Sequence, residues 1–423
     1  MNKWCSNICL YILVFCATVF MAFAMLILAA YLPQDPIDEN VRTSAYILKN
    51  EGNYLTSADG SDGTIFDNFT EAFIMMTSKA TSKESLSYTL RNPIYQYEDS
   101  IEGVGHLWDY VNDPNPVPAW YYARYWMGFR IIIRPLLTVM HYGQIRQCIA
   151  FAFFLLFAVL IADIARRLDI KTAAAFAVSI IFVKPNVICN SMQFSSCFFI
   201  AFLAMLLVPC LTHKKQFDGL FFMEVGMLTM YFDFYTTPAL TFGMPMVYLY
   251  LLRAKENSAN SAGSVMKNAG IWMAGYGLMW IAKLLLAQLL TTEETLKNGA
   301  RSLFHNTARK VDDYWGMLLD VYNKIKLTVI ADEAWCNVFS VGILVLIILI
   351  LWRIWKRTAS FRIVWERVPL LLIAIMPLLW FVIAARPLVN HYYFQYRSIA
   401  VFFWAVGAYC CILWNAGGNK KAQ

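Results

Sequence analysis

The sequence predicts an all-α polytopic membrane protein with about ten transmembrane helices and a large first extracytoplasmic loop that contains short helices. Of the 423 residues, 59% are hydrophobic and only 15% are charged, a balance that excludes a soluble enzyme. The apolar residues form runs of about 20, the length that crosses a hydrocarbon core of about 30 Å. The aromatic share of 16% fits a protein with tryptophan and tyrosine at both membrane interfaces.

The first expected span is the uncharged run from Cys9 to Leu32. It is longer than the apolar region of a signal peptide and therefore predicts a retained helix. Nine further apolar runs follow along the chain. The expected spans are 9–32, 147–164, 172–187, 194–211, 219–235, 238–252, 268–290, 336–352, 368–385 and 398–414.

Lysine and arginine in the short connections predict the orientation, because cytoplasmic loops carry an excess of both. If ten spans alternate from a cytoplasmic N-terminus, one side collects Lys3, Arg166, Arg167, Lys171, Lys214, Lys215, Arg253, Lys255, Lys267, Arg353, Lys356, Arg357, Arg362, Arg367, Lys420 and Lys421. The first loop then lies on the other side, where residues 33–120 carry 14 acidic and 5 basic side chains. We expect an integral plasma (inner) membrane protein with both termini cytoplasmic and the large loop extracytoplasmic.

We expect a single membrane domain over residues 1–423, without an internal repeat or a soluble domain. The large extracytoplasmic loop and an interfacial helix that re-enters the membrane occupy 33–146, and a second extracytoplasmic loop occupies 291–335. Membrane lipids are the expected surroundings. The net charge of +7 does not predict nucleic-acid binding, because the basic residues are dispersed between spans.

Three carboxylates, Asp35, Asp38 and Glu39, follow the first span within a few residues. If this segment is helical, Asp35 shares a face with the other two. An acid at the membrane edge can accept a proton from an incoming hydroxyl while a charged leaving group stays at headgroup level. Alternatively, these acids only cap the outward end of the span.

The segment that leads back into the membrane combines aromatic and basic residues. If 124–143 is helical, Arg130 and Arg134 share a face, with Arg124 at the beginning of the same segment. Guanidinium groups bind phosphate in bidentate fashion, so this segment is a candidate site for the phosphate of a lipid carrier. Alternatively, it is an interfacial helix whose arginines reach generic headgroups, and Pro135 predicts a break in it.

The last expected external turn carries Arg386, His391 and Arg397, on the side where the positive-inside rule disfavours cations. We therefore expect these three side chains to recognise phosphate or sugar hydroxyls. Asp233 lies near the external end of its span and is a further candidate, because an ionisable side chain facing lipid is costly. A structural hydrogen-bonding role for Asp233 is the alternative.

The ten cysteines predict neither disulfides nor a metal site, because most fall in or beside spans and none forms a C-x-x-C pair. Nucleotide-hydrolase, zinc-protease and serine-hydrolase motifs are also absent from the sequence. No cofactor and no metal ligand are predicted, although a divalent metal is compatible with the chemistry considered next.

One span, a large acidic external loop and many spans with short turns resemble the GT-C class of membrane glycosyltransferases. The matching parts are Asp35, Asp38, Glu39, the Arg124–Arg134 segment and the Arg386–Arg397 turn. The resemblance implies an enzyme that moves a sugar from a polyprenyl-phosphate-linked donor to an extracytoplasmic lipid, glycan or protein acceptor. It also implies that a first-loop acid is the general base or positions the acceptor, while arginine or histidine stabilises the phosphate leaving group.

We therefore expect a membrane glycosyltransferase of cell-envelope or surface polysaccharide assembly. A transporter or a flippase for lipid-linked oligosaccharides is the first alternative. It would need broken midplane helices, for which prolines 185, 209, 238 and 245 are available. A polysaccharide polymerase or ligase is the second, although its large loop would come late in the chain. A non-catalytic scaffold, insensitive to loss of the acids, is the third.

Overall fold

The computed structural model describes residues 3–56, 61–307, 314–329, 367–383 and 385–418, together with Ile348 and Trp352. Within these ranges the structure is all-α, as predicted, with two short β pairs. Most of the expected span 336–352 and parts of the expected loop 291–335 lie outside the described residues.

The elements fall into a first-loop group and a group of longer helices. Up to residue 137 they are α1 (Lys3–Ala30), α2 (Gln34–Glu51), β1 (Tyr54–Leu55), η1 (Asp62–Thr64), β2 (Phe66–Asp67), α3 (Asn68–Ala80), η2 (Lys83–Ser85), α4 (Leu86–Arg91), β3 (Pro93–Ile94), α5 (Val104–Asn112), β4 (Trp120–Tyr121) and α6 (Arg130–Leu137). They continue as α7 (Tyr142–Arg167), α8 (Ile170–Ile181), α9 (Pro185–Ile188), α10 (Met192–Leu207), η3 (Val208–Leu211), η4 (Lys215–Phe217), α11 (Asp218–Phe232), α12 (Pro238–Lys255), α13 (Ala262–Leu290), α14 (Thr295–Thr307), α15 (Tyr314–Val329), α18 (Val368–Ile383), α19 (Ala385–Gln395), η5 (Tyr396–Ile399) and α20 (Ala400–Gly418). β1 pairs antiparallel with β2, and β3 with β4.

Four of the described helices are long and apolar enough to cross a membrane, where the sequence predicted about ten spans. They cover Ile8–Ala30, Tyr142–Arg167, Met192–Leu211 and Ala262–Leu290. Other expected spans fold into shorter helices: α8 has 12 residues and α11 has 15. At about 1.5 Å per residue these helices are roughly 18 and 23 Å long, less than a hydrocarbon core of about 30 Å. For the described residues, the predicted number of spans is therefore wrong.

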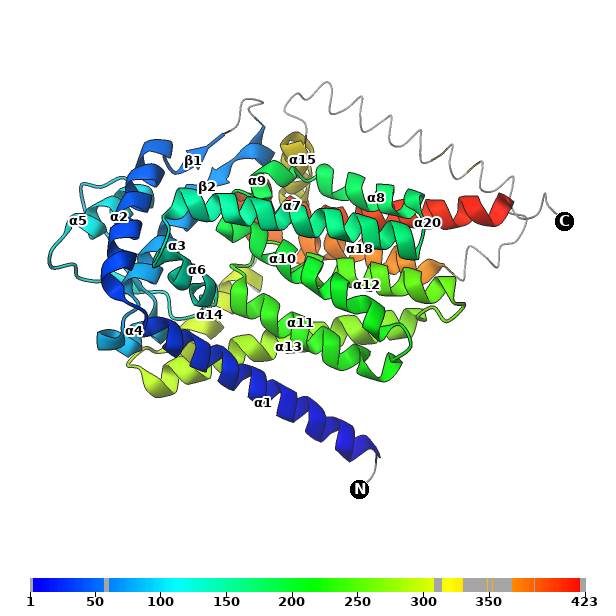
Figure 1. Cartoon of the computed structure of the whole chain (residues 1–423), viewed down its shortest axis with the longest axis horizontal. Helices are drawn as coiled ribbons and strands as arrows, with labels where there is room; N and C mark the ends of the chain where they lie inside the picture. Colours follow the sequence, from blue (N-terminus) through cyan, green and yellow to red (C-terminus); the bar gives the residue numbers. More distant parts are fainter. Residues whose placement is uncertain are drawn as a thin grey trace.

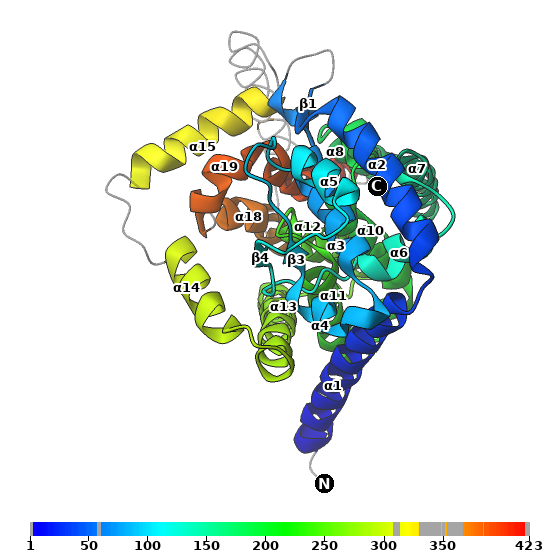
Figure 2. The same ribbon diagram turned by 90° about the vertical axis from the view of Figure 1, so that its left-hand side faces the viewer.

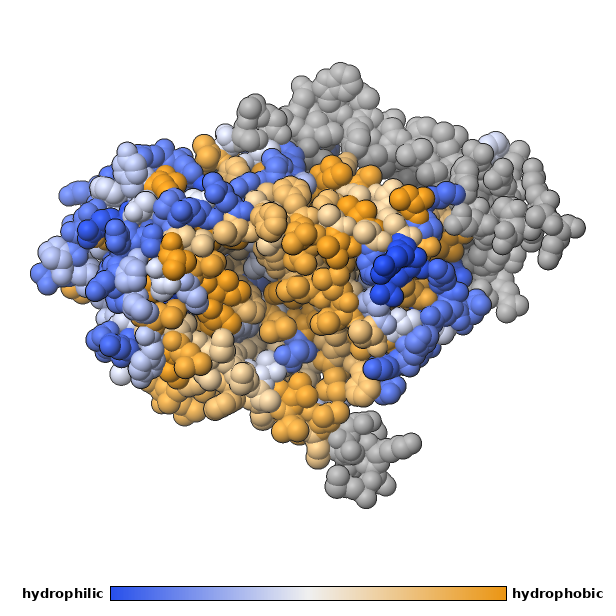
Figure 3. Space-filling model, in the orientation of Figure 1, coloured by the Kyte–Doolittle hydropathy of each residue, from blue (hydrophilic) through white to orange (hydrophobic). Residues whose placement is uncertain are grey.

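The long helices run side by side along the longest axis of the molecule, and the first loop caps one end of them (Figure 1). Figure 3 shows an apolar band across the middle of this face. Hydrophilic residues gather at the first-loop end and again in a patch at the opposite end. This distribution is the one expected when the middle of a protein lies in lipid and both ends meet water.

Helix α12 forms the centre of the main core. It is buried along almost its whole length and contacts α10, α11, α18 and α20. Aromatic side chains fill the space around these helices; Phe153, Phe176, Phe202 and Trp404, for example, lie within one buried cluster. The first loop has a core of its own, in which Val41 of α2, Met75 of α3 and Leu107 of α5 are fully buried. The loop is therefore a folded cap on the helices.

Helices α11 and α13 approach each other closely because each carries a glycine at the contact. A Cβ atom on Gly226 would lie 2.2 Å from the backbone oxygen of Trp272, and one on Gly275 would lie 2.3 Å from that of Met223. Small residues at helix contacts are typical of membrane proteins, where close backbone packing replaces the hydrophobic effect. Gly277, on the same helix as Gly275, has no neighbouring atom within 4 Å of such a Cβ.

We predict that Gly275→Ala destabilises the protein by about 1–3 kcal/mol, because the added methyl group forces the α11 backbone away. The matched control is Gly277→Ala, which should be neutral or stabilise by up to about 1 kcal/mol through helix propensity. Thermal unfolding of the detergent-purified protein measures both effects. Equal melting temperatures for the two variants would contradict the close contact.

Candidate functional site

The three predicted catalytic acids lie on α2, which is helical as the spacing argument assumed. Asp35 and Glu39 are exposed. Asp38 is half-buried, accepts a hydrogen bond from Gln34 Nε2 at 2.7 Å and pairs with Lys79 Nζ at 3.1 Å. The structure therefore gives one of these acids a structural partner and leaves the other two facing solvent.

The segment 124–143 is not one continuous helix, as the sequence analysis had assumed. The helix α6 begins only at Arg130 and ends at Leu137, two residues after Pro135, which offers no N–H to continue the ladder. Residue 127 has a positive φ of 54°, which separates this helix from the aromatic stretch before it. Arg124 consequently lies outside α6, apart from Arg130 and Arg134.

Arg130 is fully buried and joins α6 to the first loop. Its Nη1 donates to Thr81 Oγ1 at 2.7 Å, and its Nη2 donates to the Thr89 carbonyl at 2.7 Å. Its Nε donates to the Met127 carbonyl at 3.1 Å. Burial lowers the pKa of this guanidinium to about 9. All three nitrogens are occupied, which favours a structural role over phosphate binding.

Arg134 is fully buried too, and it joins three segments. Its Nε donates to the Ala29 carbonyl at the end of α1 at 2.8 Å, and its Nη1 donates to the Ser78 carbonyl in α3. Its Nη2 donates to Gln34 Oε1 in α2 at 3.2 Å. The predicted phosphate ligands of α6 thus hold the loop to the membrane helices.

The last external turn meets the first loop, and this contact brings acids and cations together. Helix α19 is kinked at His391, whose φ of −120° and ψ of 19° are not helical. The next two residues reach into the first loop: the Tyr392 hydroxyl donates to Asp62 Oδ2 at 2.7 Å, and the Tyr393 hydroxyl donates to Asp67 Oδ2 at 3.1 Å. Figure 2 looks onto this end, where the first loop, α15 and α19 meet.

We call the residues at this contact the junction cluster; they are Asp62, Asp67, Glu71, Lys184, His391, Tyr392, Tyr393 and Arg397. They come from η1, the start of α3, the residue before α9, α19 and η5. Two of them, His391 and Arg397, were predicted as substrate ligands. The acids Asp62, Asp67 and Glu71 were not singled out, because the sequence shows them only as three of 14 acidic residues in a loop.

Arg397 is the most unusual member of the junction cluster. It is 1% exposed, and its Nη2 donates to the Gly63 carbonyl at 3.1 Å. Its Nε and Nη1 have no hydrogen-bond partner in the described residues. The guanidinium lies 4.3 Å from the centre of the Phe194 ring. A buried cation without its full set of acceptors is costly, so these two nitrogens are available to an anion.

Asp67 and Glu71 are buried carboxylates one helical turn apart on α3. Burial raises the pKa of Asp67, although hydrogen bonds from Thr70 and Tyr393 and the nearby His391 oppose the shift. Burial likewise raises the pKa of Glu71, against hydrogen bonds from the Gln193 N–H and the Ser191 hydroxyl. Both of those bonds go to Oε1, at 3.0 and 2.6 Å, and Oε2 has no partner in the described residues.

Asp233 ends α11 and shapes the turn that follows. It accepts hydrogen bonds from the backbone N–H of Thr236 at 2.9 Å, from the hydroxyl of Thr236, and from Ser196 Oγ at 3.3 Å. Gln395 in α19 donates to the Tyr235 carbonyl of the same turn at 3.4 Å. These contacts favour the structural role for Asp233, as a support beneath the last external turn.

Two residues beside the junction cluster hold strained backbone conformations. Lys184 has a φ of 59°, and Tyr235 has a φ of 65°. Non-glycine residues rarely adopt this region, and such strain persists where surrounding contacts fix the chain. Lys184 Nζ also donates to the Ser61 hydroxyl, next to Asp62. The strain therefore lies where three loops are fitted against one another.

The other two predicted cations lie outside the junction cluster. Arg386 is half-buried in the first turn of α19, 11 residues before Arg397. Arg124 is half-buried, stacks over the Tyr122 ring at 5.2 Å, and lines an open pocket of about 410 Å³ beside α14.

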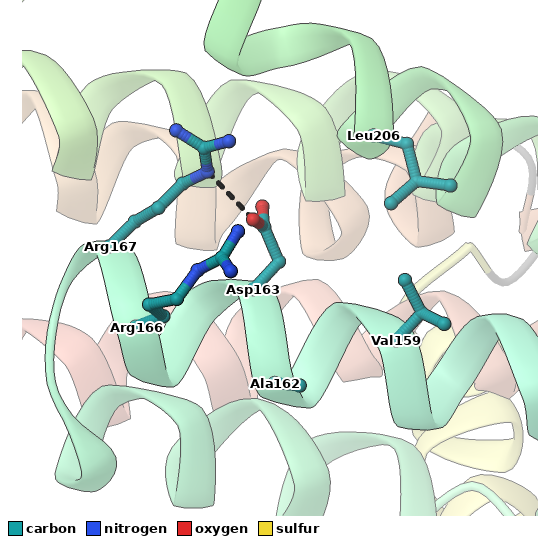
Figure 4. A pocket seen from close by; sticks show the side chains of 6 residues that line it. All are labelled: Val159, Ala162, Asp163, Arg166, Arg167 and Leu206. Carbon is teal, nitrogen blue, oxygen red and sulfur yellow. Dashed lines mark hydrogen bonds and ion pairs between the residues drawn. The ribbon is translucent and has the colours of Figure 1, made fainter.

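A second open pocket, of about 330 Å³, lies at the end of α7 far from the first loop (Figure 4). Arg167 Nε donates to Asp163 Oδ1 at 2.7 Å there, and Arg166 lies beside them. Both arginines belong to the set expected on the cytoplasmic side. In the described part of the chain, no three His, Cys, Asp or Glu side chains come together as a metal site.

Comparison of the chain with protein-family models, with curated proteins and with solved structures finds no match. The functional argument therefore depends on the residues and contacts of this chain.

We predict that acidification stabilises the wild-type first loop through Glu71. Because the pKa is raised in the folded state, protonated Glu71 contributes stability that is fully present below pH 4.5, its ordinary value, and is lost as the pH rises through the raised value. The Glu71→Gln variant keeps an oxygen for Ser191 and Gln193 but cannot ionise. Its melting temperature should therefore rise less than that of wild type between about pH 8 and pH 5.

The control for this measurement is Glu84→Gln, which removes a fully exposed carboxylate from the same loop. This variant should follow the wild-type pH dependence. An unchanged pH dependence in Glu71→Gln would show that the buried carboxyl does not titrate in this range.

Proposed function

We propose that the chain is a membrane glycosyltransferase that moves a sugar from a polyprenyl-phosphate-linked donor to an extracytoplasmic lipid, glycan or protein acceptor. In this proposal it works in the plasma membrane, in cell-envelope or surface polysaccharide assembly, with both termini cytoplasmic and the first loop outside. The observation that carries the proposal is the junction cluster, in which carboxylates and a buried, incompletely bonded guanidinium adjoin at the first-loop end of an apolar helical body.

The proposed reaction is displacement at the anomeric carbon of the donor sugar. The acceptor hydroxyl gives its proton to a carboxylate while its oxygen forms the new bond to carbon. The bond from carbon to the phosphate oxygen breaks, and the lipid phosphate leaves with that electron pair. Such a reaction needs a base on one side of the sugar and cations on the other.

Asp62 is our proposed general base. It is half-buried, and its Oδ2 accepts from Tyr392, so the carboxylate is held by one hydrogen bond and still meets solvent. Arg397 and His391 are the proposed phosphate ligands. The Nε and Nη1 atoms of Arg397 supply the donors, and His391 is exposed beside them in the chain.

Asp67 is proposed as a positioning residue. Both of its oxygens already accept hydrogen bonds, from Thr70 and Tyr393, so it is a poor proton acceptor for a substrate. Its bond to Tyr393 fixes the segment next to His391. The acids of α2, namely Asp35, Asp38 and Glu39, stay the alternative general bases, and the experiment below separates the two sets.

A flippase for lipid-linked oligosaccharides is the second candidate. It is favoured by Pro245 inside α12 and Pro377 inside α18, because prolines within helices create the breaks that transporters use. In a flippase the cations of the junction cluster would bind the carrier phosphate without breaking the sugar–phosphate bond.

We predict that purified protein in detergent transfers radiolabelled sugar from a polyprenyl-phosphate donor, and that Asp62→Asn lowers kcat by about 10²- to 10⁴-fold. Arg397→Lys should lower kcat by roughly 10²-fold or more, because lysine lacks the forked donors. Asp35→Asn and Glu39→Gln, which change exposed acids, should keep activity within about twofold. Melting temperatures of all four variants control for folding.

Three outcomes would change the proposal. Loss of transfer in Asp35→Asn, Asp38→Asn or Glu39→Gln, with Asp62→Asn active, would move the base to α2. Transfer insensitive to Arg397→Lys would remove the phosphate role from the junction cluster. Movement of donor lipid across a reconstituted bilayer, unaffected by Asp62→Asn and without sugar transfer, would favour the flippase.

A further inference from the structure

A second group of aromatic and charged side chains forms an open pocket beside α14, separate from the residues assigned above to the reaction. Its volume is about 410 Å³, within the range of small-ligand sites. The side chains that matter here are Trp120, Tyr122, Arg124, Glu293, Asn298 and Arg301. We call this the α14 pocket.

Two parts of the chain far apart in sequence form the walls of the α14 pocket. One wall is β4 and the residues after it, which are fixed by the pairing of Trp120 with Ile94 in β3. The other wall is α14 and the residues before it, directly after α13, one of the helices long enough to cross a membrane. Helix α14 also contacts α19. The pocket therefore opens at the same end of the molecule as the junction cluster.

The charges around the α14 pocket do not cancel. Glu293 already pairs with Arg91, whose Nη2 lies 2.8 Å from Glu293 Oε1 and whose guanidinium stacks 3.5 Å over the Tyr121 ring. Arg124 and Arg301 have neither a hydrogen bond nor an ion pair with another described residue. Two guanidinium groups on opposite walls thus face the pocket without a protein anion.

The aromatic side chains add a second kind of surface. Trp120 and Tyr122 are half-exposed and meet edge to face, with ring centres 5.3 Å apart. A tryptophan ring that is apolar on its face and partly exposed can stack against the C–H face of a sugar. Asn298 is exposed on α14 and offers both a donor and an acceptor to hydroxyl groups.

We propose that the α14 pocket binds a saccharide that carries a negative charge. Guanidinium groups bind a carboxylate or phosphate substituent in bidentate fashion, while the aromatic and amide groups suit the sugar ring. In its further detail the inference rests on the proposed function: the saccharide held here is the acceptor, brought toward the junction cluster through the contact of α14 with α19. This gives Arg124 a role in recognising the acceptor, distinct from the donor phosphate.

The test is a binding titration with purified full-length protein in detergent, followed by calorimetry. The probes are a tetrasaccharide of alternating glucuronic acid and N-acetylglucosamine, a neutral N-acetylglucosamine tetrasaccharide, and glucose 1-phosphate with glucose as its neutral counterpart. We expect at least one acidic probe to bind about tenfold or more tightly than its neutral counterpart. Arg124→Gln and Arg301→Gln should each remove that preference.

The matched control is Lys297→Gln. Lys297 is an exposed cation on α14 that pairs with Glu294 at 2.9 Å and does not line the pocket. This variant should change binding by no more than about twofold, because exposed ion pairs contribute little. Equal binding of acidic and neutral probes, or a preference that survives both arginine substitutions, would overturn the inference.

The binding and transfer experiments separate the two proposals. Charge-selective binding without sugar transfer would leave the α14 pocket as a saccharide site and reject the glycosyltransferase. Sugar transfer with a KM for the acceptor that is unchanged in Arg124→Gln and Arg301→Gln would keep the enzyme and reject the pocket as its acceptor site.

Discussion

The position of the first loop depends on two guanidinium groups buried in α6. Arg134 binds the carbonyl that ends α1, a carbonyl in α3 and the amide of Gln34, and Arg130 binds Thr81 and the Thr89 carbonyl. Removing an arginine from water is costly, and here the cost is offset by carbonyl and hydroxyl oxygens rather than by a carboxylate. If any of these segments moved away, a buried charge would lose its acceptors. The loop is therefore held against the membrane helices by a charge that only the assembled arrangement can satisfy.

The long apolar helices were predictable from the sequence, and the breaks between shorter ones were not. The expected spans 9–32, 147–164 and 268–290 correspond to α1, α7 and α13, because uncharged runs of this length have few alternatives to a membrane helix. The run that became α8 and α9 is equally apolar, but the left-handed conformation at Lys184 and the proline after it divide the run. The segment 124–143 failed for a similar reason, since tertiary contacts at Met127 and Pro135 limit its helix to eight residues.

The candidate site was predictable only where a residue type was unexpected for its place. His391 and Arg397 stood out because cations are disfavoured on the external side. Asp62 and Asp67 gave no such signal, since they are acids in an acidic loop. Their partners, Tyr392 and Tyr393, lie 330 and 326 residues further along the chain. Pairing over that separation is decided by how α19 kinks at His391 and meets the loop, which hydropathy and local spacing do not encode.

The separation between the two halves of the junction cluster also has a consequence for biosynthesis. The ribosome makes the carboxylates of the first loop long before the tyrosines of α19, with 330 residues between Asp62 and Tyr392. A nascent chain that has inserted α1 through α13 therefore has its loop acids but neither the hydroxyls that hold them nor the guanidinium of Arg397. The cluster is completed only by the last described helices to enter the membrane, so an incompletely inserted chain cannot carry this constellation.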